Sequence, residues 1–286
     1  SRMLPISLFI EEGEERVFLH FFDCQGLPLE RARERKLEHA LLQGEFRRVR
    51  ARQVGQMERL ELTRRQWADQ VAAAASLGHP ALRRVTVAVE GNGPDDRAIR
   101  AVLLSLGCQV EDRWRPGIPA FRASHGGFCL TAQDERGAIL DSSQLLALVA
   151  LIEMENGSGI LAVPSGASAA VDLVAAGYDG TVLRLDRDGK PARDLYAAQP
   201  WFWSAPSAAA RICARMGVSG QKLDALISKT PRFSSWRREV PLSSDRGRVM
   251  EAMVREQGRT CGGEGLRVHT GGGWVYLVPL ARRSAI

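Results

Sequence analysis

A short loop near the middle of the chain holds the residue types best suited to nucleophilic chemistry. Residues 123–126 read Ala-Ser-His-Gly, so a hydroxyl, an imidazole and an unhindered backbone follow one another. A serine next to a general base can act as a nucleophile, and glycine backbone amides can wrap a phosphate. Ser124 is therefore a candidate phosphoacceptor, with an ordinary surface loop as the simpler interpretation of so short a pattern.

Two further segments hold groups that could bind a sugar phosphate. Trp201 and Trp203 are separated by one residue, and an aromatic face can stack on the apolar face of a sugar ring. Near the end of the sequence, Arg282, Arg283 and Ser284 could hold a phosphate, which arginine binds bidentately. Core packing for the tryptophans and a solvated tail for the arginines are the simpler interpretations.

These candidates have to be positioned by a series of alternating strands and helices. Residues 85–89 form an apolar, strand-like run, residues 99–106 carry apolar side chains at helical spacing, and a second strand is predicted at 108–110. A strand, a helix and a strand at this spacing predict a βαβ unit with parallel strands. The pattern recurs from 160–163 to 181–185, so the sequence predicts α/β units in tandem.

The remaining elements change in character along the chain. A run at 145–154 is apolar on nearly every side, which predicts a buried helix between the α/β units. The last quarter of the sequence combines helical and strand patterns with a glycine-rich turn, which indicates a small α+β module. The other predicted elements are a strand at 17–23, helices at 28–43, 63–77 and 245–257, and strands at 266–269 and 274–278.

Composition places the chain among ordinary globular proteins. With 286 residues, 45% hydrophobic and 25% charged, the chain is expected to form two or three domains. Its 5 cysteines are widely spaced without a Cys-x-x-Cys pair, which favours a reducing compartment, and hence a cytoplasmic location, over a disulfide framework or a zinc site. The longest apolar run is far shorter than the ~20 residues that span a bilayer, so no membrane association is expected.

The basic charge is spread along the sequence. The formal net charge is +6, yet the arginines occur in scattered pairs such as Arg47-Arg48 and Arg83-Arg84. A nucleic-acid interface clusters its basic residues, usually with aromatic residues between them. Nucleic acid is therefore not an expected partner, and a weak nucleic-acid binder is kept only as an alternative.

Residues 121–152 show the clearest order of elements. A strand leads into the turn Asp134-Glu135-Arg136-Gly137, and a long apolar helix follows. This order resembles the segment behind the metal-binding loop of the α-D-phosphohexomutases, the phosphomannomutase/phosphoglucomutase superfamily. Residues 21–49, 163–171 and 247–279 resemble other parts of the same family in the right order. The resemblance is strongest to the mutase-like region fused behind a sugar-nucleotide pyrophosphorylase in bacterial mannose-1-phosphate guanylyltransferase-like proteins.

The resemblance also implies where catalytic motifs should lie, and they are altered. When the family pattern is aligned on Asp134, the three metal-binding aspartates correspond to Ser124, Gly126 and Phe128. Mg²⁺ prefers hard oxygen ligands, usually carboxylates, which these residues do not supply. The matched region starts after the family's phosphoserine loop, no sugar-binding Gly-Glu-x-Ser-Gly-His loop follows 181–185, and only scattered phosphate-capable groups remain of the last phosphate-binding loop.

The fold class implied is α/β: tandem mixed or parallel-sheet α/β domains of phosphohexomutase type with a small C-terminal α+β domain. Residues 1–83 would be the tail of a first mutase-like domain plus a connecting helix. Residues 84–155 would form a second domain with the degenerate metal loop, and 156–232 a third without the sugar loop. Residues 233–286 would form the small C-terminal domain.

The loss of the metal, phosphoserine and sugar motifs predicts a catalytically degenerate phosphohexomutase-like module, or pseudoenzyme. Its expected role is binding, regulation or assembly in nucleotide-sugar or carbohydrate metabolism. No cofactor is expected. The expected partners are a hexose phosphate, a fused or associated sugar-nucleotide pyrophosphorylase domain, and a second copy in a homo-oligomer. One alternative is an active sugar-phosphate mutase that uses Ser124 and Mg²⁺, and another is an oligomerisation scaffold without a ligand.

Overall fold

The computed structural model describes the chain in segments that fall into two compact units. Unit 1 comprises Ser1–Glu61 and Asp186–Ala198, and unit 2 comprises Leu62–Leu185 and Gln199–Ile286. The four domain boundaries expected from the sequence stay a prediction. The residues described are 6–12, 17–24, 26–27, 29–44, 63–76, 78, 84–124, 127–185, 194–195, 197–236, 238–241, 246–257, 265–270 and 273–278.

Unit 1 contains an antiparallel strand pair followed by a helix. Strand β1 (Ile6–Glu12) pairs with β2 (Val17–Asp23), and helix α1 (Arg31–Gln43) follows. The Asp23 carboxylate accepts a hydrogen bond from the backbone N–H of Leu27 at 3.0 Å, which closes the turn between strand and helix. The strand predicted at 17–23 is confirmed, and the predicted helix begins three residues later than expected, at Arg31.

The larger sheet of unit 2 is mixed. Its five strands run in the order β4-β3-β5-β6-β7, with β3 parallel to both β4 and β5 and the last two pairings antiparallel. The predicted βαβ unit is confirmed, because helix α3 joins β3 to its parallel neighbour β4. The elements are β3 (Thr86–Val89), α3 (Pro94–Ser105), β4 (Gln109–Glu111), β5 (Ala120–Ser124), β6 (Cys129–Gln133) and β7 (Ile139–Leu140).

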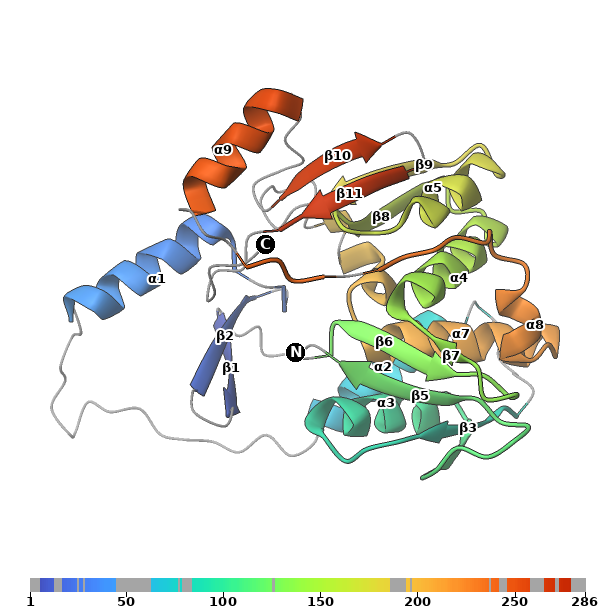
Figure 1. The fold of residues 1–286 in the computed structure, drawn as a ribbon. Helices are drawn as coiled ribbons and strands as arrows, with labels where there is room; N and C mark the ends of the chain where they lie inside the picture. The colour runs from blue at the N-terminus through green and yellow to red at the C-terminus, as the bar shows by residue number, and fades with distance from the viewer. Residues whose placement is uncertain are drawn as a thin grey trace, which may run out of the picture. The chain divides into compact units, whose positions relative to one another are not determined.

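Helix α4 (Ser142–Glu155) is the centre of unit 2. Every residue from Ala147 to Met154 is buried, which confirms the helix predicted to be apolar on all sides. Figure 1 shows α4, in green, between the large sheet and a second strand pair. That pair is a parallel βαβ unit, as predicted, formed by β8 (Ile160–Pro164), α5 (Ala169–Ala176) and β9 (Thr181–Leu185).

Helix α7 (Ala205–Ser219) connects the two parts of unit 2. It packs against α2 (Thr63–Ala75), α3 and α4, so a single hydrophobic core includes side chains from both sheets. The β10–β11 hairpin is antiparallel, as the glycine-rich turn predicts. The remaining elements are η2 (Pro200–Phe202), α8 (Leu223–Ile227), α9 (Arg246–Gln257), β10 (Leu266–Thr270) and β11 (Gly273–Leu277).

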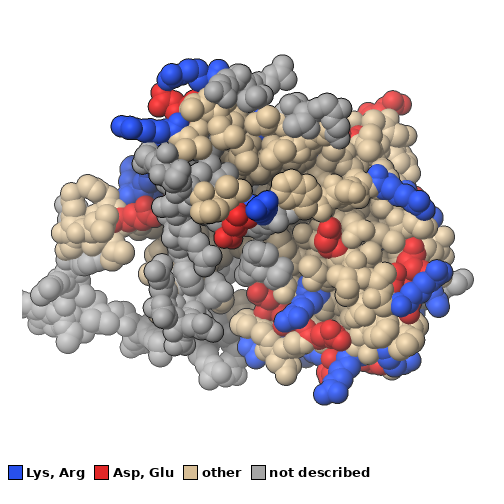
Figure 2. Space-filling view, viewed as in Figure 1, with Lys and Arg blue, Asp and Glu red and all other residues tan. Residues whose placement is uncertain are grey.

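The helices of the described residues are all too short or too polar to cross a lipid bilayer. Figure 2 shows Lys and Arg side chains interspersed with Asp and Glu over the described residues of the visible face.

The start of α4 is fixed by reciprocal hydrogen bonds. The Asp141 carboxylate accepts from the Gln144 N–H at 2.9 Å, and the Gln144 side chain accepts from the Asp141 N–H at 3.0 Å. A capping side chain of this type contributes about 0.5–2 kcal/mol. We therefore expect Asp141→Ala to lower the free energy of unfolding by about 1 kcal/mol in urea titrations.

A matched control distinguishes the effect of the helix cap from that of the second hydrogen bond that the Asp141 carboxylate accepts. The Ser235 hydroxyl also donates to Asp141, at 3.2 Å, from an exposed segment. Ser235→Ala should therefore change stability by less than about 0.5 kcal/mol. An equal loss in both variants would contradict the importance of the cap.

Candidate functional site

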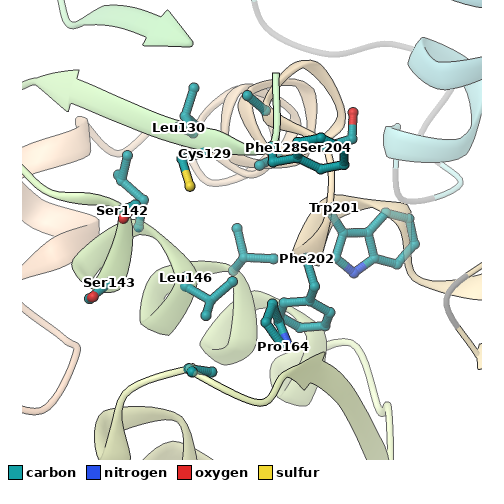
Figure 3. A pocket seen from close by; sticks show the side chains of 16 residues that line it. Phe128, Cys129, Leu130, Ser142, Ser143, Leu146, Pro164, Trp201, Phe202 and Ser204 are labelled. Atoms are coloured by element: carbon teal, nitrogen blue, oxygen red, sulfur yellow. The ribbon is translucent and has the colours of Figure 1, made fainter. Parts of the chain in front are cut away.

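A cavity of about 180 Å³ lies where four segments of unit 2 meet. Figure 3 shows the turn before β6, the start of α4, the end of β8, and the segment from η2 into the start of α7 around it. Sites for drug-sized ligands usually have about 300–1,000 Å³, so this cavity suits a ligand of about one ring.

The wall of the cavity is mainly apolar and aromatic. In Figure 3, Trp201 and Phe202 line one side, Phe128 lies beside Ser204 at the upper edge, and Pro164 lies at the lower edge. Phe202 is buried, whereas Phe128 is 42% exposed and so borders both the cavity and solvent. Two residues singled out from the sequence for different reasons, Phe128 and Trp201, therefore line one cavity. Trp203 is not among its lining residues and packs against the core.

Serine hydroxyls and helix starts form the polar part of the cavity. Ser142 and Ser143, in the first turn of α4, line the side away from Trp201 in Figure 3. Ser204 caps α7 and also lines the cavity, and its hydroxyl accepts from the Ser207 hydroxyl at 3.1 Å. The first turn of a helix carries partial positive charge from its unpaired N–H groups, which favours an anionic group nearby. Sequence reasoning did not find these serines.

The loop that the sequence resemblance aligns with the family's metal-binding loop, expected to have lost its ligands, connects β5 to β6. Ser124 ends β5 and pairs with Cys129 in the ladder. Its side chain, together with His125 and Gly126, lies outside the described residues. Gly127 has a φ of 79°, and a Cβ there would lie 3.1 Å from a carboxylate oxygen of Asp95 at the start of α3. Glycine therefore permits both the left-handed turn and the close approach of α3.

The described residues around this loop do not fit a Mg²⁺ site. Within the described part of the chain, no group of three or more His, Cys, Asp or Glu side chains is placed to hold a metal ion. The described residues that line the cavity contribute hydroxyls, one thiol, the Trp201 indole and apolar groups, without a carboxylate. Phe128, which the sequence resemblance aligns with the third aspartate, supplies a phenyl ring and no hard oxygen ligand.

The turn that carries the resemblance has a structural role in this chain. The Asp134 carboxylate accepts from the backbone N–H groups of Arg136 at 2.9 Å and Ala138 at 2.8 Å, which closes the turn. The buried Glu135 carboxylate caps α8, accepting from the N–H of Leu223 at 2.7 Å and from that of Asp224 at 3.0 Å. Both carboxylates therefore stabilise the scaffold, Asp134 within its own turn and Glu135 at the start of α8.

A buried ion pair supports the aromatic wall from behind. Arg211 of α7 lies 2.6 Å from Glu153 of α4, and both side chains are almost fully buried. The Arg211 guanidinium also donates to the Ala74 and Ala75 carbonyls at the end of α2, at 3.4 Å each. Its carbon lies 4.3 Å from the centre of the Trp201 ring, a cation–π distance. The position of Trp201 is thus tied to three helices.

The C-terminal hairpin lies against the loop that follows β8. Arg267 of β10 donates to the Ser165 carbonyl, and its guanidinium carbon lies 4.4 Å from the centre of the Trp274 ring. Ser165 directly follows Pro164, which lines the cavity. The candidates Arg282, Arg283 and Ser284 lie outside the described residues, so their predicted role in phosphate binding stays a prediction.

Comparison with known proteins gives similarity in structure alone. No protein-family model matches the sequence, and no curated protein matches it. A phosphoglucomutase/phosphomannomutase family protein from Burkholderia thailandensis superposes with a TM-score of 0.67 at 14% identity, over 94% of this chain and 68% of that one. The fold is of the phosphohexomutase type. This confirms the mixed α/β fold predicted from the resemblance.

A second solved structure agrees over a smaller region. A Thermus thermophilus protein described as a candidate phosphomannomutase superposes with a TM-score of 0.54 at 14% identity, over 74% of this chain and 59% of that one. This chain therefore spans about two thirds of the Burkholderia protein and less of the Thermus protein. At this level of identity the likeness establishes the phosphohexomutase-type fold, and activity has to be inferred from the cavity.

Proposed function

We propose that this chain is a phosphohexomutase-like module that binds a hexose phosphate without catalysing phosphoryl transfer. Its biological role would then be binding, regulation or assembly in carbohydrate or nucleotide-sugar metabolism. The observation that carries the proposal is that Phe128, the residue that the sequence resemblance aligns with a metal-binding aspartate, lines the cavity.

The chemistry of phosphoryl transfer supports this proposal. The transfer needs a positioned nucleophile and cations that neutralise the charge on the transferred group. A phenyl ring supplies neither a metal ligand nor a hydrogen bond, and the described lining residues around it add no carboxylate. A bound phosphorylated sugar would therefore be held without the charge neutralisation that lowers the reaction barrier.

The cavity nevertheless suits a small sugar phosphate. The indole of Trp201, held by Arg211, offers a rigid apolar surface for one face of a sugar ring. On the other side, Ser142 and Ser143 offer hydroxyls in the first turn of α4, and these can donate hydrogen bonds to a phosphate. The apolar side of the cavity would contact the sugar ring, and the polar side would contact the phosphate.

Binding can be tested with a variant on the rim of the cavity. Glucose 1-phosphate and mannose 1-phosphate are titrated by calorimetry, in buffer with EDTA and in buffer with Mg²⁺. We expect saturable binding that EDTA does not weaken, and an affinity about tenfold lower in Phe128→Ala because an aromatic contact at the rim of the cavity is lost. Ile139→Ala is the matched control, since Ile139 is 73% exposed on β7 and does not line the cavity. Absence of saturable binding would favour the scaffold without a ligand.

Catalysis is tested separately. The protein is incubated with glucose 1-phosphate, glucose 1,6-bisphosphate and Mg²⁺, and formation of glucose 6-phosphate is followed by a coupled assay. We expect no turnover above background. Mg²⁺-dependent turnover that Ser124→Ala abolishes would overturn the non-catalytic proposal and establish the active mutase.

A further inference from the structure

The side chain of Gln199 occupies the outer edge of strand β8. Its amide oxygen accepts a hydrogen bond from the Ala162 N–H at 2.8 Å, and its amide nitrogen donates to the Ile160 carbonyl at 2.8 Å. Among the described strands, β8 pairs only with β9, so this edge has no neighbouring strand. Because a primary amide offers the donor and the acceptor of a peptide group, Gln199 takes the place there of a third strand.

Gln199 is also the first residue of unit 2 after the chain returns from unit 1. The chain passes from unit 2 to unit 1 after Leu185, and the segment Asp186–Ala198 belongs to unit 1. The Gln199 carbonyl accepts from the Phe202 N–H at 3.3 Å, which forms the first hydrogen bond of η2. One residue therefore anchors the returning chain through its side chain and begins η2 through its backbone.

Helix η2 carries the aromatic wall of the cavity. Trp201 and Phe202, the second and third residues after Gln199, both line the cavity. Phe202 is 3% exposed and fixes the far end of η2 in the hydrophobic core, while Arg211 lies against the Trp201 ring. At the near end, the Gln199 amide ties η2 to β8, which ends at the lining residue Pro164. The amide therefore joins two of the segments that surround the cavity.

We propose that Gln199 is a positioning residue of the candidate site, because it sets the place of Trp201 by fixing η2 to β8. Among the described residues, Gln199 does not line the cavity, so it acts on a ligand only through the groups that it holds. Its partner strand is rigid, since Leu161, Ala162 and Val163 in the middle of β8 are fully buried. The effect on a sugar phosphate rests on the function proposed above, whereas the position of Trp201 can be measured without a ligand.

The position of Trp201 is tested by fluorine NMR of the intact chain labelled with 5-fluorotryptophan. The chain has 6 tryptophans, and Trp201→Phe identifies the resonance of this one. In Gln199→Glu at pH 7, the carboxylate keeps an acceptor for β8 but has lost the donor. We expect the Trp201 resonance to move or broaden, and that of Trp114, whose Nε1 donates to the Asp134 carbonyl at 2.9 Å, to stay. An unchanged Trp201 resonance would overturn the proposal.

Acid should restore the wild-type resonance in Gln199→Glu. A protonated carboxyl group has both a donor and an acceptor, so it can form the two bonds that the glutamine amide forms. The facing Ile160 carbonyl favours the protonated form, so the recovery should begin at a pH above the ordinary pKa of a glutamate. The wild-type resonance should show no such titration. A resonance that stays displaced in acid, in a variant that circular dichroism shows to be folded, would contradict the role of this hydrogen bond.

Calorimetry with glucose 1-phosphate and mannose 1-phosphate measures the consequence for the site. We expect Gln199→Glu to bind about tenfold more weakly than the wild type at pH 7, because Trp201 is displaced. Gln221→Glu is the matched control, since Gln221 accepts from the exposed Lys229 at 2.7 Å and does not line the cavity. If the wild type binds neither sugar phosphate, the ligand proposal fails, and the Trp201 resonance still decides the role of Gln199. Wild-type affinity in Gln199→Glu would overturn that role in the site.

Discussion

Arg211→Ala is expected to lower the free energy of unfolding of unit 2 by about 3–5 kcal/mol, since it removes one partner of a buried ion pair. The Glu153 side chain is only 2% exposed, so its charge cannot be hydrated when the guanidinium is lost. The variant also loses the hydrogen bonds to the end of α2 and the contact with Trp201. All 6 tryptophans lie in unit 2, so tryptophan fluorescence in urea reports on this unit.

The same two helices supply the control. Arg215 and Glu155 also form an ion pair between α7 and α4, but their side chains are 22% and 23% exposed. Arg215→Ala should therefore cost no more than about 1 kcal/mol. Similar losses in the two arginine variants would contradict the role of burial. In addition, the double replacement Glu153→Leu with Arg211→Met should be less destabilising than Arg211→Ala, because no unpaired charge is then buried.

Glu135→Ala is expected to lower the free energy of unfolding by about 1–3 kcal/mol. The Glu135 carboxylate, 5% exposed, accepts from two backbone N–H groups at the start of α8. Alanine leaves those donors without an acceptor in a site that water reaches poorly. The change is measured in urea by tryptophan fluorescence, and hydrogen exchange should rise in α8 before it rises in α7.

Arg136→Ala is the control in the neighbouring position. Arg136 pairs with Asp224 at 2.8 Å, but its side chain is 81% exposed. Its replacement should change stability by less than about 1 kcal/mol. If Glu135→Ala were as mild as Arg136→Ala, the buried cap would not be what fixes α8.

The elements of the fold were largely predictable from the sequence because their signals are local. The βαβ units and the buried helix α4 follow from apolar spacing within short windows. Strand β1 was missed, although residues 6–10 read Ile-Ser-Leu-Phe-Ile, a short apolar run that is consistent with a strand. The Asp134–Gly137 turn was recognised, but the role of Glu135 was not, because its partners lie 88 and 89 residues further along the chain.

The candidate site was only partly predictable, because its residues come from segments that are far apart in the sequence. Phe128 and Trp201 were each named from the sequence, but only the packing of α4 and α7 brings them to one cavity. Ser142 and Ser143 were overlooked, although the Asp141-Ser142-Ser143-Gln144 pattern marks the start of a helix. Arg211 was also missed, because a charge in the buried face of a helix is stable only with a partner that the local sequence does not reveal.

The burial of α4 has a consequence for how unit 2 unfolds. Its apolar residues pack on β6 and α7 as well as on α5, so the helix is shared by both sheets. Separating the strand pair from the large sheet would expose one side of α4 to water, at about 25 cal/mol for each Å² of apolar surface. Neither sheet can therefore melt alone at low cost. Unit 2 should lose its structure in one cooperative transition, and a cut between the two sheets would leave both fragments prone to aggregation.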